Sequence, residues 1–332
     1  MAKFLIIRFS SIGDIVLTTP VVRCLRKQLP GAEIHFLTRQ AFRGMVATNP
    51  YIDKVHVLGD SFELMLHELQ TEEYDYIIDL HHNLRTLRIK RFLKKVKAFS
   101  FHKLNIEKFV LTNLKINMLP DKHIVDRNLE TVRSFGIQDD GQGLDYFIPE
   151  ADVVDNNDLP TSHLHGYIAV VIGAALATKK LPVHKLKELC AALDHPLILL
   201  GGKEDQEDGK AIASVDEVKI YNACGKFSLN ESADLVRRSK LVITHDTGLM
   251  HIAAALQKPI ISAWGNTVPA FGMYPYYGKY SKQHYDVVEI NKLWCRPCSK
   301  IGYRKCPRGH FKCMENIAVN DIVNLVRHRL RQ

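Results

Sequence analysis

Short apolar runs alternate with helical patterns along the first half of the chain. A run such as Phe4-Leu5-Ile6-Ile7 is continuous, which is typical of a strand buried on both faces of a parallel sheet. The pattern predicts strands at Lys3 to Arg8, Glu33 to Leu37, Lys54 to Val57 and Tyr76 to Leu80. A helical stretch from Ile15 to Leu29 ends at Pro30-Gly31. The alternation predicts α/β units with right-handed crossovers.

The second half of the chain repeats this alternation. We expect strands at Tyr167 to Ile172, Pro196 to Leu200, Val218 to Tyr221, Leu241 to Thr244 and Pro259 to Ala263. Helical patterns lie between them, at residues 183–193, 204–214, 229–238 and 247–256, and a last helix with a basic end covers Ala318 to Leu330. The fold class expected is therefore α/β, with two Rossmann-like halves.

The two halves meet in a polar stretch at residues 137–165, which contains a turn cluster and Pro160 and is typical of a linker. A chain of 332 residues also fits two domains better than one. We expect an N-terminal domain at residues 1–150, a C-terminal domain at 160–316 and a final helix at 317–332. Two such domains would face each other across a cleft lined by the carboxyl ends of both sheets.

Composition narrows the class of protein. Apolar residues make up 46% and charged residues 24% of the chain, as in soluble globular proteins. No apolar run approaches the roughly 20 residues that span a bilayer, and the N-terminal apolar stretch is too short for a signal peptide, so we expect a cytoplasmic protein. The net charge of +9 suits nucleic acid, acidic lipid surfaces or phosphorylated substrates, without choosing among them.

The loop Phe9 to Asp14 follows the first strand and precedes the first helix. Ser10, Ser11 and Asp14 are all residue types that cap helices, so Asp14 could serve only that purpose. The functional alternative is a carboxylate at the mouth of the cleft that accepts a proton as a general base. The loop lacks the G-x-G-x-x-G pattern, which argues against a dinucleotide site in this half.

Three loops of the second half together suggest a site for a nucleotide-diphosphate sugar. Gly173 to Lys180 offers small residues followed by two lysines, which suit a pyrophosphate unless they are only a solvated helix start. Asp246, Thr247 and Gly248 stand at a helix N-terminus, whose free N–H groups can bind an anion. Gly201 to Glu204 follows a further strand, while His251 fits either a buried core histidine or a ligand contact.

Three segments resemble glycosyltransferase family 9, the ADP-heptose–lipopolysaccharide heptosyltransferases. They are Leu5 to Pro20, His245 to Leu256, and Lys258-Pro259 running to Trp264-Gly265. The resemblance implies a GT-B fold, in which the N-terminal domain binds the acceptor, the C-terminal domain binds the donor, and the C-terminal helix crosses back to pack on the N-terminal domain. It also implies inverting transfer that needs no metal.

The resemblance assigns residues as well. Asp14 falls on the general base of the family, Lys179 or Lys180 near the lysine that neutralises the donor phosphate, and Glu204 near a residue that binds the ribose. The donor-binding residues expected are Gly173, Lys179, Lys180, Glu204, Asp246, Thr247, Gly248, Leu249 and His251. The acceptor-binding residues expected are Ser10, Ser11, Gly13, Arg85 and Arg88.

A basic stretch, Arg85 to Lys97, holds seven basic residues and no acidic one. It is either a solvated face or a docking surface for an anionic glycolipid acceptor at the inner membrane, as the family's acceptors would require. Leu87, Phe92, Leu93 and Val96 are spaced to anchor it on the body of the protein. The segment from Lys103 to Lys115 has a similar amphipathic pattern of apolar and basic residues.

Four cysteines, Cys295, Cys298, Cys306 and Cys313, fall within residues 295–313. Four thiolates could hold a structural zinc, although the second pair lacks C-x-x-C spacing and His310 competes as a ligand. Reduced structural cysteines, or a disulfide formed on isolation, are the alternatives.

Two other functions compete with glycosyl transfer. A UDP-sugar epimerase of the GT-B class would need acid–base groups around the sugar and no acceptor site. A nucleic-acid-binding protein with a zinc module would explain the charge, but the basic residues cluster away from the cysteines and show no aromatic interleaving, so we expect no nucleic-acid partner.

Overall fold

The computed structural model describes residues 2–280 and 284–331, which form two compact units. Unit 1 comprises Met1–Leu104 and Lys122–Phe147, and unit 2 comprises Asn105–Asp121 and Ile148–Gln332. The main crossing between units falls at Phe147 and Ile148, inside the polar stretch expected to be a linker. Residues 105–121 belong to unit 2 although they lie between two segments of unit 1, and the sequence did not predict this. In the described residues, no helix is both long and apolar enough to cross a membrane.

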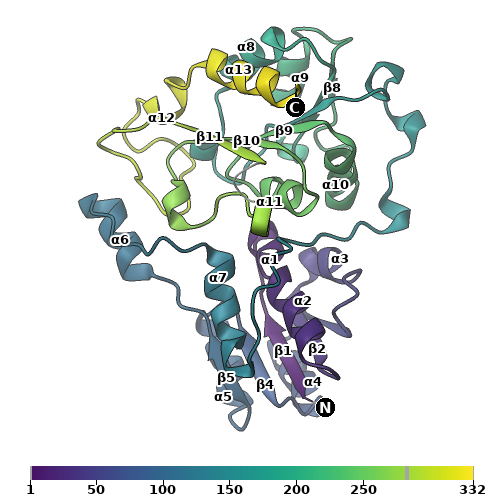
Figure 1. The fold of residues 1–332 in the computed structure, drawn as a ribbon, viewed down its shortest axis with the longest axis vertical. Helices are drawn as coiled ribbons and strands as arrows, with labels where there is room; N and C mark the ends of the chain where they lie inside the picture. The colour runs from purple at the N-terminus through teal and green to yellow at the C-terminus, as the bar shows by residue number, and fades with distance from the viewer. Residues whose placement is uncertain (1, 281–283, 332) are drawn as a thin grey trace. The chain divides into compact units, whose positions relative to one another are not determined.

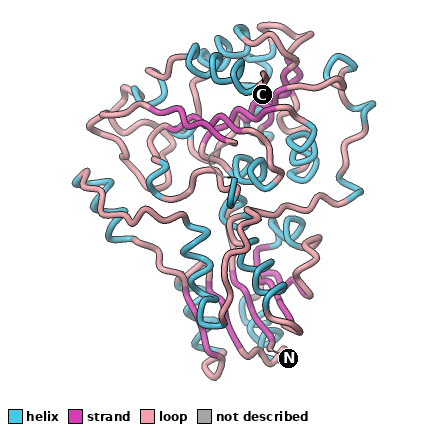
Figure 2. The backbone as a smooth tube through the Cα atoms, in the orientation of Figure 1, coloured by secondary structure: helices cyan, strands magenta, loops and turns pink. Residues whose placement is uncertain are grey.

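Unit 1 is built on a five-stranded parallel sheet in the order β3-β2-β1-β4-β5 (Figures 1 and 2). Its strands are β1 (Lys3–Ile7), β2 (Glu33–Arg39), β3 (Lys54–Leu58), β4 (Tyr76–Asp79) and β5 (Lys97–Ser100). Its α-helices are α1 (Ile12–Val16), α2 (Thr19–Gln28), α3 (Arg43–Val46), α4 (Phe62–Thr71), α5 (Leu84–Phe92) and α7 (Ile124–Leu129). Phe4, Leu5, Ile6 and Ile7 are fully buried, as the continuous apolar run of β1 predicts.

The first helical stretch is broken where a single helix was expected. Helix α1 ends at Val16, and α2 begins at Thr19 with Pro20 in its first turn. Proline has no N–H to donate and is favoured in the first turn of a helix, so a new helix starts here. The break leaves α1 as a short separate element that carries Asp14.

Unit 2 is built on a six-stranded parallel sheet in the order β11-β10-β9-β6-β7-β8. Its strands are β6 (Ile168–Val171), β7 (Leu197–Leu200), β8 (Ile220–Asn222), β9 (Leu241–His245), β10 (Ile260–Trp264) and β11 (Tyr285–Glu289). Its α-helices are α6 (Asn105–Leu114), α8 (Val183–Ala192), α9 (Gln206–Ala213), α10 (Leu229–Arg238), α11 (Gly248–Ala255), α12 (Lys312–Glu315) and α13 (Val319–Arg329).

The last helix belongs to unit 2. Helix α13 packs against α8, β10 and β11, and Val319, Ile322, Val323 and Val326 lie in the core of this unit. Arg329 also pairs with Asp286 on β11 at 2.7 Å. The apolar face of α13 is buried within unit 2, and the expectation that this helix also crosses back onto the N-terminal domain stays a prediction. In Figure 1 the helix lies beside α8.

Two edge strands were missed by the sequence analysis. Strand β5 begins at Lys97, the last residue of the basic stretch, and its residues Lys97, Ala98 and Ser100 are exposed. Strand β11 is only partly buried along its whole length. Both lie at a sheet edge and bury less than the central strands, so neither carries the continuous apolar run by which the central strands were found.

Candidate functional site

Both sheets are parallel, so within each unit the loops that follow the strands gather at one edge. In unit 1 this edge carries the loop after β1, with Asp14, and the residues that follow β4. In unit 2 it carries the loops after β6, β7, β9 and β10. The candidate site residues of each unit therefore lie where ligands bind in open α/β sheets.

Asp14 sits in the first turn of α1 and has both carboxylate oxygens engaged. Oδ1 lies 2.5 Å from Nη2 of Arg8. Oδ2 accepts hydrogen bonds from the backbone N–H of Ser11 at 3.1 Å and from its hydroxyl at 2.7 Å. The side chain remains 20% exposed. Asp14 therefore caps its helix and also presents a fixed, solvent-reachable carboxylate, so the two interpretations of this residue are compatible.

Arg8 was not identified from the sequence as a site residue. It is buried directly after β1, where its guanidinium donates from Nε to the Ser10 carbonyl at 2.9 Å and from Nη1 to the Leu80 carbonyl. The Phe101 ring centroid lies 5.9 Å from the guanidinium carbon. These contacts hold Arg8 rigidly, and Arg8 in turn holds Asp14. A cation directly after a buried apolar strand is the feature of the sequence that could have indicated Arg8.

His81 is a second residue that was not identified from the sequence as a site residue. It follows β4, and its ring packs edge-on against Phe9 with centroids 5.1 Å apart. Its Nδ1 is buried and has no hydrogen-bond partner among the described residues. Burial, with Arg8 and Lys103 nearby, lowers the pKa of His81 to about 4, so the imidazole is neutral at pH 7. A neutral imidazole with an open nitrogen can contact a hydroxyl.

The other expected acceptor residues fall into two groups. Ser10 and Gly13 belong to the loop and first turn beside Asp14, and Ser11 positions Asp14 through its hydroxyl. Arg85 and Arg88 are exposed on α5, where the Arg88 guanidinium stacks 4.4 Å from the Phe62 ring centroid.

The basic stretch is only partly available to a ligand. Lys90 points inward and pairs with the fully buried Asp79 at 2.7 Å, so it is structural. The expected anchors are corrected in part, because Leu93 is buried while Leu87 and Phe92 are exposed. Thr86 and Ile89 form the buried face of α5 instead. The face of α5 that packs on the core therefore differs from the face that the spacing of its apolar residues predicted.

In unit 2, Gly173 is required by packing. A Cβ atom at this position would lie 2.3 Å from Oδ2 of Asp205 and 3.1 Å from the Gly201 backbone. Asp205 is buried, accepts from the Gly202 N–H at 2.9 Å and pairs with Lys180. Lys180 is therefore committed to a buried carboxylate, and the glycine makes room for that carboxylate.

Lys179 has a different partner from its neighbour. Its ammonium lies 2.6 Å from Oδ2 of Asp246, and the same oxygen accepts the Thr267 hydroxyl at 2.9 Å. These two contacts join the loops after β6, β9 and β10. Lys179 is 19% exposed, so it can reach a ligand phosphate while it is held in place.

Helix α11 begins at this point. Thr247 is its N-cap, Gly248 opens its first turn, and the Thr244 and Thr247 hydroxyl oxygens lie 3.3 Å apart. Leu249 is partly buried, whereas His251 is buried on the inner face. The first turn of α11 lies beside Lys179, so the anion site predicted from the sequence has a cation and a helix N-terminus next to each other.

His245 ends β9, and Glu204 belongs to the loop that follows β7. The Leu181 N–H donates to Nε2 of His245 at 2.9 Å, and burial lowers the pKa of His245 to about 4, so this histidine is a structural neutral acceptor. Glu204 is exposed after β7, in the short helical turn Lys203–Asp205.

Asn266 is the most informative residue that the sequence analysis missed. It follows β10, is 1% exposed, and neither Oδ1 nor Nδ2 has a hydrogen-bond partner in the part of the chain that the structure describes. A buried amide without partners costs about 1–3 kcal/mol, which a ligand can recover by hydrogen bonding to it. Arg296 fixes this loop by donating to the Gly265 carbonyl at 2.6 Å and to the Thr267 carbonyl at 2.9 Å.

The four clustered cysteines do not converge in the structure. No three of their sulfurs, alone or with another described ligand atom, form a group within 4.8 Å of one another. All four are free thiols, and Cys295 Sγ lies 3.7 Å from Nε2 of His310. Burial raises the pKa of Cys313 to about 12, so its thiol is protonated in this arrangement. The zinc site at these cysteines stays a prediction.

Most of the sequence matches a known protein family. The model of glycosyltransferase family 9 (heptosyltransferase) matches residues 64–306. The chain belongs to glycosyltransferase family 9. The expected family is confirmed, and with it the expectation that the chain is a glycosyltransferase; neither the epimerase nor the nucleic-acid-binding alternative is favoured.

Curated relatives cover nearly the same length as this family 9 chain. Lipopolysaccharide heptosyltransferase 1 of Campylobacter coli is 24% identical over 350 residues, with 98% of each chain covered. Lipooligosaccharide heptosyltransferase 2 of Haemophilus influenzae is 27% identical over 294 residues, covering 81% of this chain and 85% of the relative. Both alignments extend beyond the residues that the family model matches.

Solved structures agree on the fold. The family 9 glycosyltransferase from Veillonella parvula has a TM-score of 0.80 at 22% identity, covering 99% of this chain and 97% of its own. Escherichia coli ADP-heptose lipopolysaccharide heptosyltransferase II has a TM-score of 0.74 at 19% identity, with 99% of each chain covered. The GT-B class expected for this family 9 enzyme is confirmed, with two parallel-sheet α/β units.

Proposed function

We propose that the chain transfers a heptose from ADP-heptose to a lipopolysaccharide-core or related glycolipid acceptor, with inversion at the anomeric carbon. The observation that carries the proposal is the carboxylate of Asp14, fixed by Arg8 and Ser11 at the carboxyl edge of a parallel sheet in a family 9 enzyme. The names of the relatives support the sugar and the acceptor, because they are lipopolysaccharide and lipooligosaccharide heptosyltransferases. A similar Escherichia coli heptosyltransferase was solved with ADP and with ADP-2-deoxy-2-fluoro heptose.

Asp14 is the proposed general base. The acceptor hydroxyl oxygen forms a bond to the anomeric carbon, the bond from that carbon to the diphosphate oxygen breaks, and the hydroxyl proton passes to Asp14. The exposed part of the Asp14 carboxylate is the part available for this proton. Arg8 acts as a positioning residue, because its buried guanidinium pairs with the Asp14 carboxylate and is itself bonded to the backbone. Such a positioned base contributes about 10²–10⁴-fold in rate.

The donor diphosphate is proposed to bind at the start of α11. Lys179 and the first-turn N–H groups would hold the phosphate charge, and Asn266 would donate to or accept from the donor. The leaving ADP gains negative charge as the bond breaks, and a fixed cation with helix N–H groups stabilises that charge in the transition state. Asp246 and Glu204 would contact sugar or ribose hydroxyls.

The proposed chemistry uses no metal ion, because Lys179 and the helix terminus take the place of a divalent cation on the diphosphate. A zinc ion at Cys295, Cys298, Cys306 and Cys313 would need these thiols to draw together from their present positions. We assign it no step in the reaction, and metal analysis of freshly purified protein tests whether it forms.

The acceptor is proposed to reach the enzyme at a membrane surface. Helix α6 and the residues after it expose an apolar surface formed by Ile106, Phe109, Leu114, Ile116 and Met118. The Lys115 ammonium donates to the Pro297 carbonyl at 2.6 Å, which joins this segment to the cysteine-rich segment of the same unit. That segment exposes Trp294 and Ile301 among Lys300, Arg304 and Lys305. Apolar anchors surrounded by cations suit an anionic bilayer.

A transfer assay tests the proposed function. Purified protein is incubated with ADP-heptose and a heptose-free lipopolysaccharide-core glycolipid, and product is followed by mass spectrometry and ADP release. We expect a mass gain of one heptose that requires both substrates and survives chelation by EDTA. Transfer from UDP- or GDP-sugars in preference to ADP-heptose would overturn the donor assignment, and sugar conversion without acceptor would overturn glycosyl transfer itself.

A further inference from the structure

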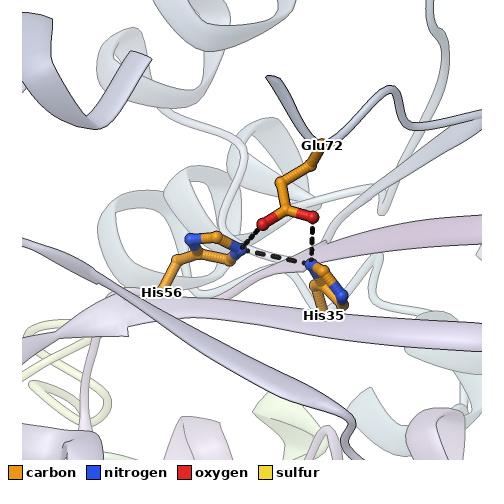
Figure 3. Close-up of side chains that lie close together, drawn as sticks. All are labelled: His35, His56 and Glu72. Atoms are coloured by element: carbon orange, nitrogen blue, oxygen red, sulfur yellow. Dashed lines mark hydrogen bonds and ion pairs between the residues drawn. The ribbon is translucent and has the colours of Figure 1, made fainter. Parts of the chain in front are cut away.

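Two histidines and a glutamate converge in unit 1 (Figure 3). His35 lies on β2, His56 lies on β3, and Glu72 is the residue that ends α4. Lys3, at the first position of β1, reaches the same glutamate, so the cluster belongs to the amino-end half of the sheet. Both imidazoles are almost fully buried. The glycosyl transfer proposed above has no use for these side chains.

The distances among the three side chains resemble those in a metal site. His35 Nδ1 lies 3.2 Å from His56 Nε2, and each of these nitrogens lies 3.7 Å from an oxygen of Glu72. A tetrahedral zinc with bonds of about 2.0–2.1 Å places its ligand atoms roughly 3.3–3.4 Å apart. The three ligand atoms therefore need to move by only a few tenths of an ångström to share one ion.

A second carboxylate orients His35. Glu33 Oε1 lies 2.8 Å from Nε2 of His35, so the carboxylate takes the Nε2–H and leaves Nδ1 with its lone pair toward His56 and Glu72. A carboxylate that holds the far nitrogen of a histidine is the usual outer contact of a metal-bound histidine.

Tyr74 is a fourth member of the cluster, because its hydroxyl contacts both histidines. Its buried hydroxyl lies 2.9 Å from His35 Nδ1 and 3.0 Å from His56 Nε2. One hydroxyl hydrogen can serve only one of two nitrogens that already face each other. When His56 carries its proton on Nδ1, both facing nitrogens present lone pairs, and the single Tyr74 hydrogen satisfies only one of them.

From this arrangement we propose a structural site for a divalent transition-metal ion of the zinc class, bound by His35 Nδ1, His56 Nε2 and Glu72, with the Tyr74 oxygen at the fourth position. Two imidazoles and a carboxylate suit zinc in both donor type and number. The ion would tie β2, β3 and the connection between α4 and β4 to one another. Its role would be to stabilise unit 1.

Two lysines pair with Glu72 and lower the affinity expected for the metal ion. Lys3 lies 2.6 Å from Oε2 and Lys54 lies 2.5 Å from Oε1, and a carboxylate oxygen has a second lone pair for a further partner. Both cations repel an incoming metal ion. Lys54 is 55% exposed and can swing into solvent, whereas Lys3 is 19% exposed and also pairs with Glu33 at 3.1 Å. Lys54 therefore competes with the ion and should weaken its binding.

Zinc titration of the full-length, metal-stripped protein tests the proposal. Affinity is measured by competition with a chromophoric chelator, on a background in which Cys295, Cys298, Cys306 and Cys313 are changed to serine, so that thiolate binding does not contribute. We expect one bound equivalent. H56Q should abolish this binding, and K54M should tighten it by about tenfold, because a unit positive charge beside the ion is removed. H67Q, a change at an exposed histidine of α4, is the matched control and should bind like the parent.

A readout besides affinity separates a metal site from a structural hydrogen-bond cluster. Zinc should raise the melting temperature of the parent and K54M proteins, and should leave that of H56Q unchanged, while circular dichroism shows all three folded. Cobalt should give a tetrahedral visible spectrum without a thiolate charge-transfer band. Equal zinc binding by the parent and H56Q, weaker binding by K54M, or no bound equivalent in the parent would overturn the proposal.

Discussion

Arg8 and Asp14 form an ion pair of 2.5 Å within the first loop of the chain. Arg8 ends a buried strand and is fixed by two backbone carbonyls, one of them from Leu80 at the end of β4. Asp14 is thus held by the body of unit 1 as well as by its own helix. This pair gives the proposed general base a defined direction, which proximity-based catalysis requires.

Replacement of Asp14 by asparagine should abolish most of the turnover. Asparagine keeps the shape and can still accept from Ser11, but it cannot accept a proton at neutral pH. We expect kcat to fall by about 10²–10⁴-fold, while the dissociation constant for ADP-heptose, measured by calorimetry, stays within a few-fold of the parent value. Turnover close to that of the parent would remove Asp14 from the mechanism.

Arg8→Gln provides the comparison for that experiment. If Arg8 only positions Asp14, its loss should lower kcat and change the pH profile of kcat, since the base loses the cation beside its carboxylate and keeps the contacts to Ser11. A variant that lost activity with an unchanged pH profile would show that Arg8 acts elsewhere, for example on the acceptor.

Lys179 and Lys180 should behave differently although they are adjacent. Lys179→Met should weaken donor binding by about tenfold or more, because a cation beside the diphosphate is lost, with little change in stability. Lys180→Met should lower the free energy of unfolding by about 1–3 kcal/mol, because it leaves buried Asp205 without its cation. Urea denaturation and donor titration on both variants measure the contrast. Equal effects of both changes on donor affinity would contradict the assignment.

This contrast shows where sequence reasoning stops. The central strands were found because a continuous apolar run bounded by turn residues is typical of a buried strand, and the loops after them were correctly chosen as sites of polar function. The partners of Lys179 and Lys180 depend on the short helical turn Ala177–Lys179, which turns the two side chains toward Asp246 and Asp205. Nothing in a pair of adjacent lysines indicates that division.

The same limit applies to residues whose importance depends on tertiary packing. Arg8 could be taken as the polar end of a strand, but its bond to the Leu80 carbonyl joins positions 72 residues apart. Asn266 is inconspicuous in the sequence, and only the packed loop reveals a buried amide without partners among the described residues. Strand β5 was hidden because most of its residues are exposed and it begins where the basic stretch ends.

Asn266→Ala should separate binding from stability. Removal of a buried amide that lacks partners in the described part of the chain should leave the free energy of unfolding unchanged or raise it, since no hydrogen bond is lost. Donor binding should weaken by roughly 10-fold if the amide makes one hydrogen bond to the ligand. Asn222→Ala is the matched control, because the Asn222 amide is already bonded to Cys224 N–H and the Gln206 carbonyl. It should lose stability and keep donor affinity; the reverse pattern would contradict the role of Asn266.

His245 should make stability depend on pH below neutrality. Burial lowers its pKa from 6.5 to about 4, so between these pH values the unfolded chain binds a proton that the folded chain does not. The free energy of unfolding therefore rises with pH across this window, and the contribution of His245 is lost as pH falls from 6.5 to 4. His245→Gln, which can still accept from the Leu181 N–H, should show a smaller slope in urea denaturation at stepped pH. An unchanged slope would show that the folded protein protonates His245 at no cost.

The apolar surface of residues 106–118 should bind anionic membranes. Ile106 is 77% exposed and Phe109 is 63% exposed on the same helix, where burial in a bilayer would remove both from water. We expect the double change Ile106→Ser and Phe109→Ser to reduce flotation with phosphatidylglycerol vesicles by at least roughly tenfold, and to leave turnover of a soluble, delipidated acceptor unchanged. Val218→Ser is the matched control, because Val218 is 81% exposed in unit 2 and lies outside this surface. Raised salt should also weaken binding, since cations surround the apolar anchors. Equal flotation of the double variant and the control would show that the acceptor is reached without this surface.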